Sequence, residues 1–515
     1  MPKLHRASVC ALFVASLIVL GGVTPSSAQK SKDTLRMSAN DVYSVLSPYD
    51  MALEEAGQIY DQIYSPLLSL EEKTGKWVPE LATSWTRVDP LTLEFNLREG
   101  VMLHSGKRFT ADDIKAAIDY TIDPKTKIRS KNRYTWVKSA EKLGDHKLRV
   151  HLVAPYALDL LAFASRFSVI DSDIMAKLDN KEDYGRVSAA SAGPYKLVSM
   201  DRNRGSVVER FEGLNSALTH RRAPIRRIEI VAVPDRQAQI AQMLTGGLDL
   251  LRNVPEDAAK ELAKIPTLQI TPVKSSSYIY LMMDAIARSG RKELSDARVR
   301  KAIVMAIDRE KIAKEIVPGG SEAEQMSAIC FPFTLACDPS SKPYGYDPAQ
   351  AKKLLAEAGY PNGFEMTLHV HQPVRDIAIA VAGYLQQIGI NMSVSQQTIS
   401  GYIQLREDGK LAAFIGFRPT GTFPETSEIL DSFFTGSRDY WNDPLIAKAM
   451  TDGASEPDNL KRGRILRPAL DRNNSEAYIL PISSMPWVFA HTKEVRVDTN
   501  LLKANAVQIS DIFWK

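Results

Sequence analysis

Apolar and polar positions along this chain follow two spacings that alternate from one segment to the next. In residues 91–97, Leu and Phe alternate with Thr, Glu and Asn, which predicts a half-buried strand, and residues 147–152 repeat this pattern. In residues 297–307 and 351–358 the apolar positions instead recur at helical spacing. Such alternation of strand and helix patterns predicts an α/β architecture.

The predicted helices have recognisable ends. Ser295-Asp296 precedes the first of them, and Asp347-Pro348 precedes the second, which stops at Gly359. Asp before the first turn, Pro in it and Gly just past the last turn are the residues expected there. A third helix is predicted to open at Thr110, because Asp113 follows three residues later as in a capping box.

The segment around that third helix also carries the most specific motif. Residues 96–118 read N-L-R-E-G-V-M-L-H-S-G-K-R-F-T-A-D-D-I-K-A-A-I. This run resembles the signature of the family 5 extracytoplasmic solute-binding proteins, the peptide- and nickel-type receptors of bacterial ABC importers. The usual form is L-R-x-G-V-x-F-H-[DS]-G-x-x-[FL]-T-A-x-D-V, from which only Leu103 and Ile114 depart.

The resemblance continues along nearly the whole chain, in the family's order. Further matching segments are G-P-Y-K-L at 193–197, V-x-V-P-D and T-G-G-L-D-L within 228–250, the run D-A-R-V-R-K-A-I-V-M-A-I-D-R-E-K-I at 296–312, and Y-D-P-A-Q-A-K-K-L-L-A-E-A-G-Y-P-N-G-F at 346–364. Several pieces in one order are far more specific than any single piece.

The resemblance implies a two-lobed periplasmic-binding-protein fold with a cleft between the lobes and an extra subdomain on the N-terminal lobe. We expect the first lobe to span residues 29–271 and to close again with 481–515, and the second lobe to span 272–480. The two crossings near Pro272 and Pro481 would then form the hinge. The implied protein is a monomer without a cofactor, which traps a small polar solute and delivers it to an ABC permease.

The N-terminus and the overall charge agree with export. Residues 1–28 have a basic start, an apolar run of secretory length and small residues at the end, so we expect cleavage after Ala28 and a periplasmic location. The formal net charge of +4 over 515 residues argues against a general nucleic-acid surface. Export also favours a local disulfide between Cys330 and Cys337, because a metal site lacks a third ligand nearby and a redox pair is more often C-x-x-C.

Three segments hold candidate solute contacts, since burying a polar solute needs aromatic walls and a few polar groups. The first is V-L-S-P-Y-D, in which Tyr49 forms a wall unless the segment is a surface turn. The second is His369-Val370-His371-Gln372, where both imidazoles share one face of a strand. We favour a polar cleft rim over a metal site there, with Arg375 available to pair with an anionic group of the ligand.

The third segment is residues 415–424, where peptide-binding members of the family read G-W-x-x-D-x-x-x-P. Phe417 replaces the Trp, and Thr420 stands where the Asp pairs with the free amino group of a peptide. A buried ammonium without a carboxylate is costly, by about 3–5 kcal/mol, and Arg418 adds repulsion. An anionic, amine-blocked, sugar-like or opine-like solute therefore fits better than a free peptide. Tyr440 and Trp441 are either further cleft aromatics or core residues.

Two other classes of function are an enzyme and a periplasmic adaptor or chaperone. Ser289–Lys292 matches S-x-x-K and Lys73–Gly75 matches K-T-G, but their order is the reverse of that in penicillin-binding serine enzymes. Residues 139–142 match S-x-x-K as well, and the sequence has no G-x-S-x-G, H-E-x-x-H or P-loop motif. We therefore expect no enzyme. A periplasmic adaptor or chaperone that uses the same cleft is the remaining alternative.

Overall fold

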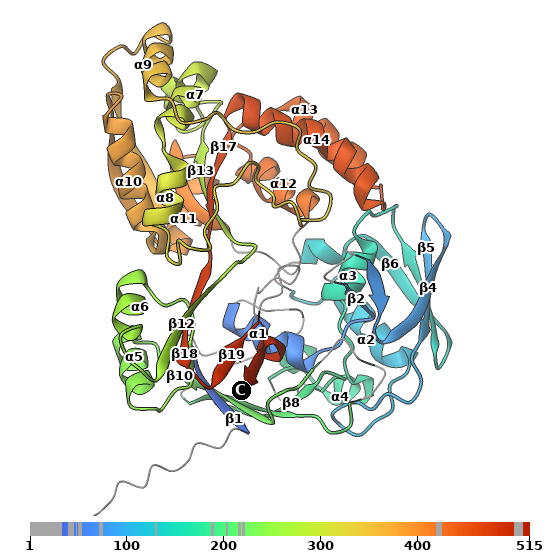
Figure 1. The fold of residues 1–515 in the computed structure, drawn as a ribbon. Coiled ribbons are helices and arrows are strands. Elements are labelled where there is room, and N and C mark those ends of the chain that lie inside the picture. The colour runs from blue at the N-terminus through green and yellow to red at the C-terminus, as the bar shows by residue number, and fades with distance from the viewer. Residues whose placement is uncertain are drawn as a thin grey trace, which may run out of the picture.

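A computed structural model of the chain describes most of the sequence. The described residues are 33–39, 46–47, 49, 54–71, 76–128, 131–186, 190–201, 204–214, 218, 222–418, 425–498 and 508–515. These residues form two lobes joined by two chain crossings, with a separate subdomain beside the first lobe (Figure 1). The predicted two-lobed α/β fold with an extra subdomain is thereby confirmed.

The first lobe is built on a seven-stranded sheet in the order β12-β18-β11-β1-β10-β9-β8. Its strands are β1 (Thr34–Ala39), β8 (Tyr195–Asp201), β9 (Gly205–Arg210), β10 (Arg227–Ala232), β11 (Leu250–Leu251), β12 (Leu268–Val273) and β18 (Trp487–Thr492). β1 runs parallel to β10 and β11, whereas β18 is antiparallel to both its neighbours. Helices α5 (Arg236–Leu244) and α6 (Glu256–Leu262) cover one face of this sheet.

The extra subdomain is a four-stranded antiparallel sheet in the order β4-β5-β7-β6, packed against helix α2 (Ala111–Ile122). Its strands are β4 (Ala82–Asp89), β5 (Thr92–Leu97), β6 (Val137–Gly144) and β7 (Lys147–Leu152). The alternation predicted for residues 91–97 holds from Leu93 onward, since Leu93, Phe95 and Leu97 are buried. Leu91 is 41% exposed, because it lies in the turn before β5.

Shorter elements complete the first lobe and its subdomain. They are α1 (Glu54–Ile63), β2 (Leu68–Leu70), β3 (Trp77–Pro79), α3 (Asp159–Ser165), α4 (Ser172–Lys177), β19 (Val495–Val497) and β20 (Ile512–Trp514). β2 pairs with β3, and β19 pairs with β20. One hydrophobic core joins the subdomain to the first lobe and includes C-terminal residues such as Phe489 and Ile512.

The second lobe has a five-stranded sheet in the order β15-β14-β16-β13-β17. Its strands are β13 (Tyr278–Met283), β14 (Phe364–His371), β15 (Ile390–Gln397), β16 (Ala413–Arg418) and β17 (Ile479–Ser484). One core, on the face with α7 (Ala297–Ala306), α8 (Arg309–Glu315), α9 (Pro348–Glu357) and α10 (Arg375–Gln386), holds Leu281 and Ile415. The other, on the face with α11 (Ile399–Glu407), α12 (Thr426–Phe434), α13 (Pro444–Gly453) and α14 (Asn459–Glu476), holds Tyr280 and Phe414.

The chain passes between the lobes twice, at residues 274–277 and 485–486. These positions differ by a few residues from the predicted hinge, because Pro272 lies inside β12 and Pro481 lies inside β17. Each of these strands is at an edge of its sheet. An edge strand accepts Pro, since the missing N–H faces away from the ladder.

The family motifs mainly hold helices and loops in place. Asp113 is fully buried and accepts hydrogen bonds from Thr110 N (2.9 Å) and from the Lys107 ammonium (2.8 Å). The His104 ring lies 2.9 Å from the Gly193 carbonyl, so the first two motif segments contact each other. Asp296 and Asp347 cap α7 and α9, and Gly359 follows α9 with a φ of 95°, as the sequence predicts.

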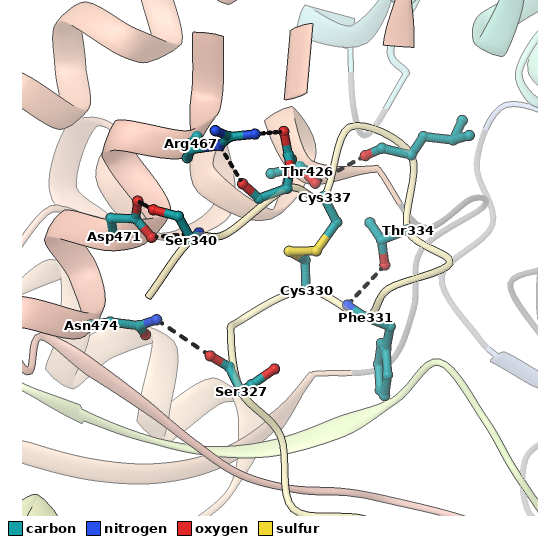
Figure 2. Close-up of a disulfide and its surroundings, with 12 residues drawn as sticks. Ser327, Cys330, Phe331, Thr334, Cys337, Ser340, Thr426, Arg467, Asp471 and Asn474 are labelled. Carbon is teal, nitrogen blue, oxygen red and sulfur yellow. Dashed lines mark hydrogen bonds and ion pairs between the residues drawn. A yellow bond between two sulfur atoms is a disulfide. The ribbon is translucent and has the colours of Figure 1, made fainter. Parts of the chain in front are cut away.

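A disulfide between Cys330 and Cys337 closes a short loop of the second lobe (Figure 2). The predicted bridge is confirmed, with Cα atoms 6.0 Å apart. The loop is held from both sides, because Thr426 Oγ1 donates to the Leu335 carbonyl (2.9 Å) and Arg467 of α14 pairs with Asp338. This arrangement fixes the loop tip, which carries Leu335, toward the first lobe.

Candidate functional site between the lobes

A cavity of about 890 Å³ lies between the lobes beside the two crossings. The first lobe contributes Arg236 and the start of α6, the second lobe contributes Phe417 and the start of α10, and the crossing contributes Met485. The carboxyl ends of the parallel strands β14 and β16 point toward this region. Ligands of α/β proteins bind at such strand ends, so the interlobe space is the candidate site.

The lobes also touch on the side away from α6, where α14 approaches α3 (Figure 1). Ala157 N donates a 2.9 Å hydrogen bond to the Ala454 carbonyl, which joins the subdomain to the second lobe. Leu335 at the tip of the disulfide loop packs in one cluster with Leu70 and Trp77 of the first lobe. The space between the lobes is therefore bordered by contacts on both sides.

Of the aromatic residues predicted to contact the solute, Phe417 lines the interlobe cavity. It is the penultimate residue of β16, is partly buried, and its ring lies 5.9 Å from the ring of His371. Gly416 before it has no room for a side chain, because a Cβ there would lie 2.8 Å from the Tyr280 hydroxyl. The Gly-aromatic pair thus lets the strand end pack closely while one flat ring faces the cavity.

Arg418 ends β16 and points to the opposite face of the sheet. Its Nε donates to Ser432 Oγ (3.2 Å), and its terminal nitrogen is 3.4 Å from the Glu428 carbonyl oxygen. Within the described part of the chain, no carboxylate pairs with Arg418. The Tyr278 hydroxyl on the neighbouring strand is buried without a partner there, and burial raises the Tyr278 pKa. This end of the sheet therefore presents an unneutralised cation.

His371 ends β14 inside a group of aromatic rings. Its ring centroid lies 4.8 Å from those of Tyr402 and Phe414. Both ring nitrogens are buried and find no hydrogen-bond partner among the described residues. Burial lowers the His371 pKa to about 4, so the imidazole is neutral at neutral pH. His369 does share a face with His371, as predicted, but its Nδ1 is engaged by Gln397 (3.2 Å).

Gln372 and Arg375 lie next to the cavity rim and remain predictions as solute contacts. Both residues are exposed, and Arg375 lies 3.8 Å from the neighbouring carboxylate of Asp376, which lines the cavity. Thr420, which replaces the family's Asp, lies outside the described residues.

The other three predicted aromatics are packed in cores in this structure. Tyr49 is 6% exposed, and its hydroxyl donates to the Ser168 carbonyl (3.2 Å). Tyr440 is fully buried, and the Trp441 indole donates to the Met283 carbonyl (2.8 Å). Satisfied hydrogen bonds inside a core favour the interpretation of Tyr440 and Trp441 as core residues over that of cleft aromatics.

Sequence reasoning missed two residues of the interlobe region. Arg166 follows α3 in the first lobe, is 7% exposed, and forms an ion pair with Glu428 of α12 in the second lobe. Neither residue lies in a recognisable motif. Their ion pair joins two lobes, so it depends on the tertiary structure and leaves no signal in the local sequence.

Three further features of the described residues bear on the candidate site. They contain no group of three or more His, Cys, Asp or Glu side chains arranged to hold a metal ion. Ser289 of the S-x-x-K match donates to Asp284 (2.7 Å). None of the helices in the described ranges is long and apolar enough to span a membrane.

Two lobes, two crossings and an interlobe cavity define the class of two-lobed solute-binding proteins. The chain belongs to the bacterial extracellular solute-binding proteins, family 5, whose model matches residues 76–441. Members of this family bind solutes for ABC importers and are not enzymes, so the chain is a solute-binding protein of such an importer. The resemblance stated from the motifs is confirmed.

Individual relatives support the same placement. The glutathione-binding protein GsiB of Pectobacterium atrosepticum is 24% identical over 96% of this chain and 95% of its own length. NikA from Brucella suis, solved with Fe(III)-EDTA, has a TM-score of 0.81 at 20% identity and covers 94% of this chain and 100% of its own. AgaA from A. tumefaciens R10, solved with agropinic acid, has a TM-score of 0.71 at 21% identity and covers 94% and 99%.

Proposed function

We propose that this protein traps a small solute bearing a carboxylate and no free ammonium, of the opine or blocked-peptide kind, between its lobes. The observation that carries the proposal is Arg418, a cation at the end of β16 whose contacts are a hydroxyl and a carbonyl. A solute carboxylate would supply the missing counter-charge, and charge-assisted hydrogen bonds to Arg are among the strongest available. Phe417, the preceding residue on the opposite face of β16, would form an apolar wall of the interlobe cavity.

The sequence at position 420 supports the same choice of solute. Thr420 stands where peptide-binding members carry the Asp that neutralises a free amino group. Two fold neighbours have also been solved with carboxylate-bearing solutes that lack a free ammonium, namely Fe(III)-EDTA and agropinic acid. An anionic solute is consistent with both facts.

The proposed cycle follows from the two-lobed architecture. A solute held by both lobes stabilises the form in which they are together, because it contacts both only there. The permease of the importer would then recognise the loaded form. The location we propose is the periplasm, after removal of residues 1–28 behind Ala28, and the working form is a monomer.

Matched pairs of solutes test this proposal. Thermal-shift and calorimetric titrations would compare agropinic acid with its methyl ester, a dipeptide with its N-acetyl and its amide derivatives, and a sugar phosphate with the free sugar. A ligand at 100 times its Kd stabilises a protein by about 2.7 kcal/mol, which is visible as a raised Tm. We expect at least one acidic member to bind, N-acetylation not to weaken binding, and Arg418→Gln to weaken it tenfold or more.

Arg438→Gln is the matched control, since Arg438 is also on the second lobe but pairs with Asp431 of α12. It should leave affinity unchanged. A preference for free-amine peptides, or equal affinity of the Arg418→Gln variant and the wild type, would contradict the proposed solute class while leaving the family assignment intact.

A further inference from the structure

Two arginines from different lobes meet at one glutamate in this structure. Arg166 of the first lobe pairs through its terminal nitrogen with the Glu428 carboxylate. Arg418 of the second lobe approaches the backbone carbonyl of the same residue at 3.4 Å. Both arginines therefore contact the same residue of α12 from different lobes, Arg166 at its carboxylate and Arg418 at its backbone carbonyl.

The charges of this cluster do not balance. Arg166 and Arg418 bring two positive charges, while Glu428 brings one negative charge that faces Arg166. Ser432, the other side-chain contact of Arg418, is neutral. Among the described residues, Glu428 is the one carboxylate that pairs with either arginine, so two positive charges face a single negative charge. An unpaired charge is costly at Arg166, which is almost fully buried, and less so at Arg418, which is half-buried.

Arg166 also has unused hydrogen-bonding capacity. It is 7% exposed, and its Nε is buried without a partner among the described residues. Its one other side-chain contact is weak, since its NH1 lies 3.4 Å from the Tyr156 hydroxyl. A buried guanidinium donor normally has an acceptor, because leaving it unpaired carries the full cost of desolvation.

We infer that Arg166 is a specificity-determining residue, which together with Arg418 binds one carboxylate or other oxyanion of the solute from both lobes. The inference rests on the proposed function and adds a first-lobe partner to it. An oxyanion between the two arginines would neutralise the excess charge and accept the unused donors. It would also tie the lobes together, so that recognition of the anion and lobe closure become a single event. In the solute-free protein Glu428 partly takes the place of this anion.

The role of Glu428 provides the decisive experiment. If Arg166 acts only through its ion pair, then Arg166→Gln and Glu428→Gln remove the same interaction and should weaken solute binding equally. If Arg166 binds the solute, Arg166→Gln should weaken binding tenfold or more, whereas Glu428→Gln should leave it unchanged or tighten it by releasing Arg166. Arg166→Lys keeps the charge and should recover part of the affinity.

The measurement is calorimetry of the full mature protein with the matched pairs described above, beginning with agropinic acid and its methyl ester. In Arg166→Gln the preference for the acid over the ester should fall in parallel with the loss of affinity, a change that a purely structural residue would not cause. Circular dichroism and the Tm of each unligated variant check that it folds.

The outcomes separate this inference from the proposed function. Loss of binding in Arg418→Gln but not in Arg166→Gln would overturn the two-arginine site and leave the proposed solute class standing. Equal losses in Arg166→Gln and Glu428→Gln would assign Arg166 to the ion pair alone and also overturn the inference. If no acidic member binds the wild type, both proposals are wrong.

Discussion

Individual side chains differ in how far the sequence alone defines their roles. Asp296 and Asp347 were predictable as helix caps, because a cap acts on backbone groups two or three residues away. Tyr440 and Trp441 were not, since an aromatic ring suits a core as well as a cleft and only the tertiary packing decides between them. The role of Arg166 could not be predicted from the sequence either, because its ion-pair partner lies in the other lobe.

Phe417→Ala tests the aromatic wall at the level of one residue. Removing the ring should weaken solute binding at least several-fold, because the solute loses an apolar contact in the cavity. The unligated protein should lose little stability, since Phe417 is only partly buried. Calorimetry of the variant, alongside urea unfolding, measures both quantities. Unchanged affinity would remove Phe417 from the site.

His371 should make stability depend on pH. Its folded pKa, lowered to about 4 by burial, lies below the ordinary value of 6.5, so the unfolded chain binds more protons between these values. Stability is therefore complete above pH 6.5 and falls as the pH drops toward 4. With allowance for partial exposure we expect a loss on the order of 2 kcal/mol.

Urea unfolding of the wild type and His371→Leu at pH 7 and pH 4.5 checks this expectation. At pH 7 the variant should be at least as stable, because it removes two buried nitrogens that lack partners. At pH 4.5 it should lose less stability than the wild type. Burial also lowers the pKa values of His369 and His491, so the difference between the two proteins, and not the total, reports on His371. Parallel pH curves would show that His371 is not the titrating group.

At the level of elements, short patterns located strands and helices well, whereas the residues at which the chain leaves each lobe depend on where the edge strands end. The Cys330–Cys337 bridge was predictable because six intervening residues and an exported chain leave few alternatives. Pro272 and Pro481 each lie in an edge strand that needs no N–H from them, so the chain leaves each lobe a few residues later. Hydrophobic patterning identifies a strand without showing whether it lies at the edge or the centre of its sheet.

The disulfide loop should contribute measurably to stability. Replacing both cysteines, Cys330→Ser with Cys337→Ser, releases a short closed loop, which costs about 2–3 kcal/mol by the chain-entropy argument. The double variant should keep its fold, because contacts such as Arg467 with Asp338 still hold the loop against α14 (Figure 2). Chemical denaturation of the oxidised wild type and the double variant measures the difference, and equal midpoints would contradict it.

At the scale of the whole molecule, the contacts between the lobes near α14 should determine the fraction of molecules in which the two lobes are together. Leu335 packs against Leu70 and Trp77 across the interlobe boundary, so Leu335→Ala removes a contact that the separated lobes lack. We expect a larger radius of gyration in X-ray scattering of the unligated protein and a several-fold loss of solute affinity.

Leu445→Ala is a matched control for this experiment. Leu445 is also on the second lobe but is 43% exposed on α13, away from the residues that contact the first lobe. Its truncation should change neither the radius of gyration nor the affinity. Indistinguishable scattering from Leu335→Ala and Leu445→Ala would show that the loop tip does not govern lobe separation.

The order of strands in the first lobe has a consequence for biosynthesis. β18 lies between β11 and β12 in that sheet, yet the entire second lobe is translated between β12 and β18. At about 5–20 residues per second, the ribosome needs ten seconds or more to make this intervening stretch. The first-lobe sheet of a nascent chain therefore lacks the strand between β11 and β12 until β18 has been translated. A chain that stays incomplete for so long remains available for threading across a membrane, and one truncated before β18 lacks the strand that joins β12 to the rest of the sheet.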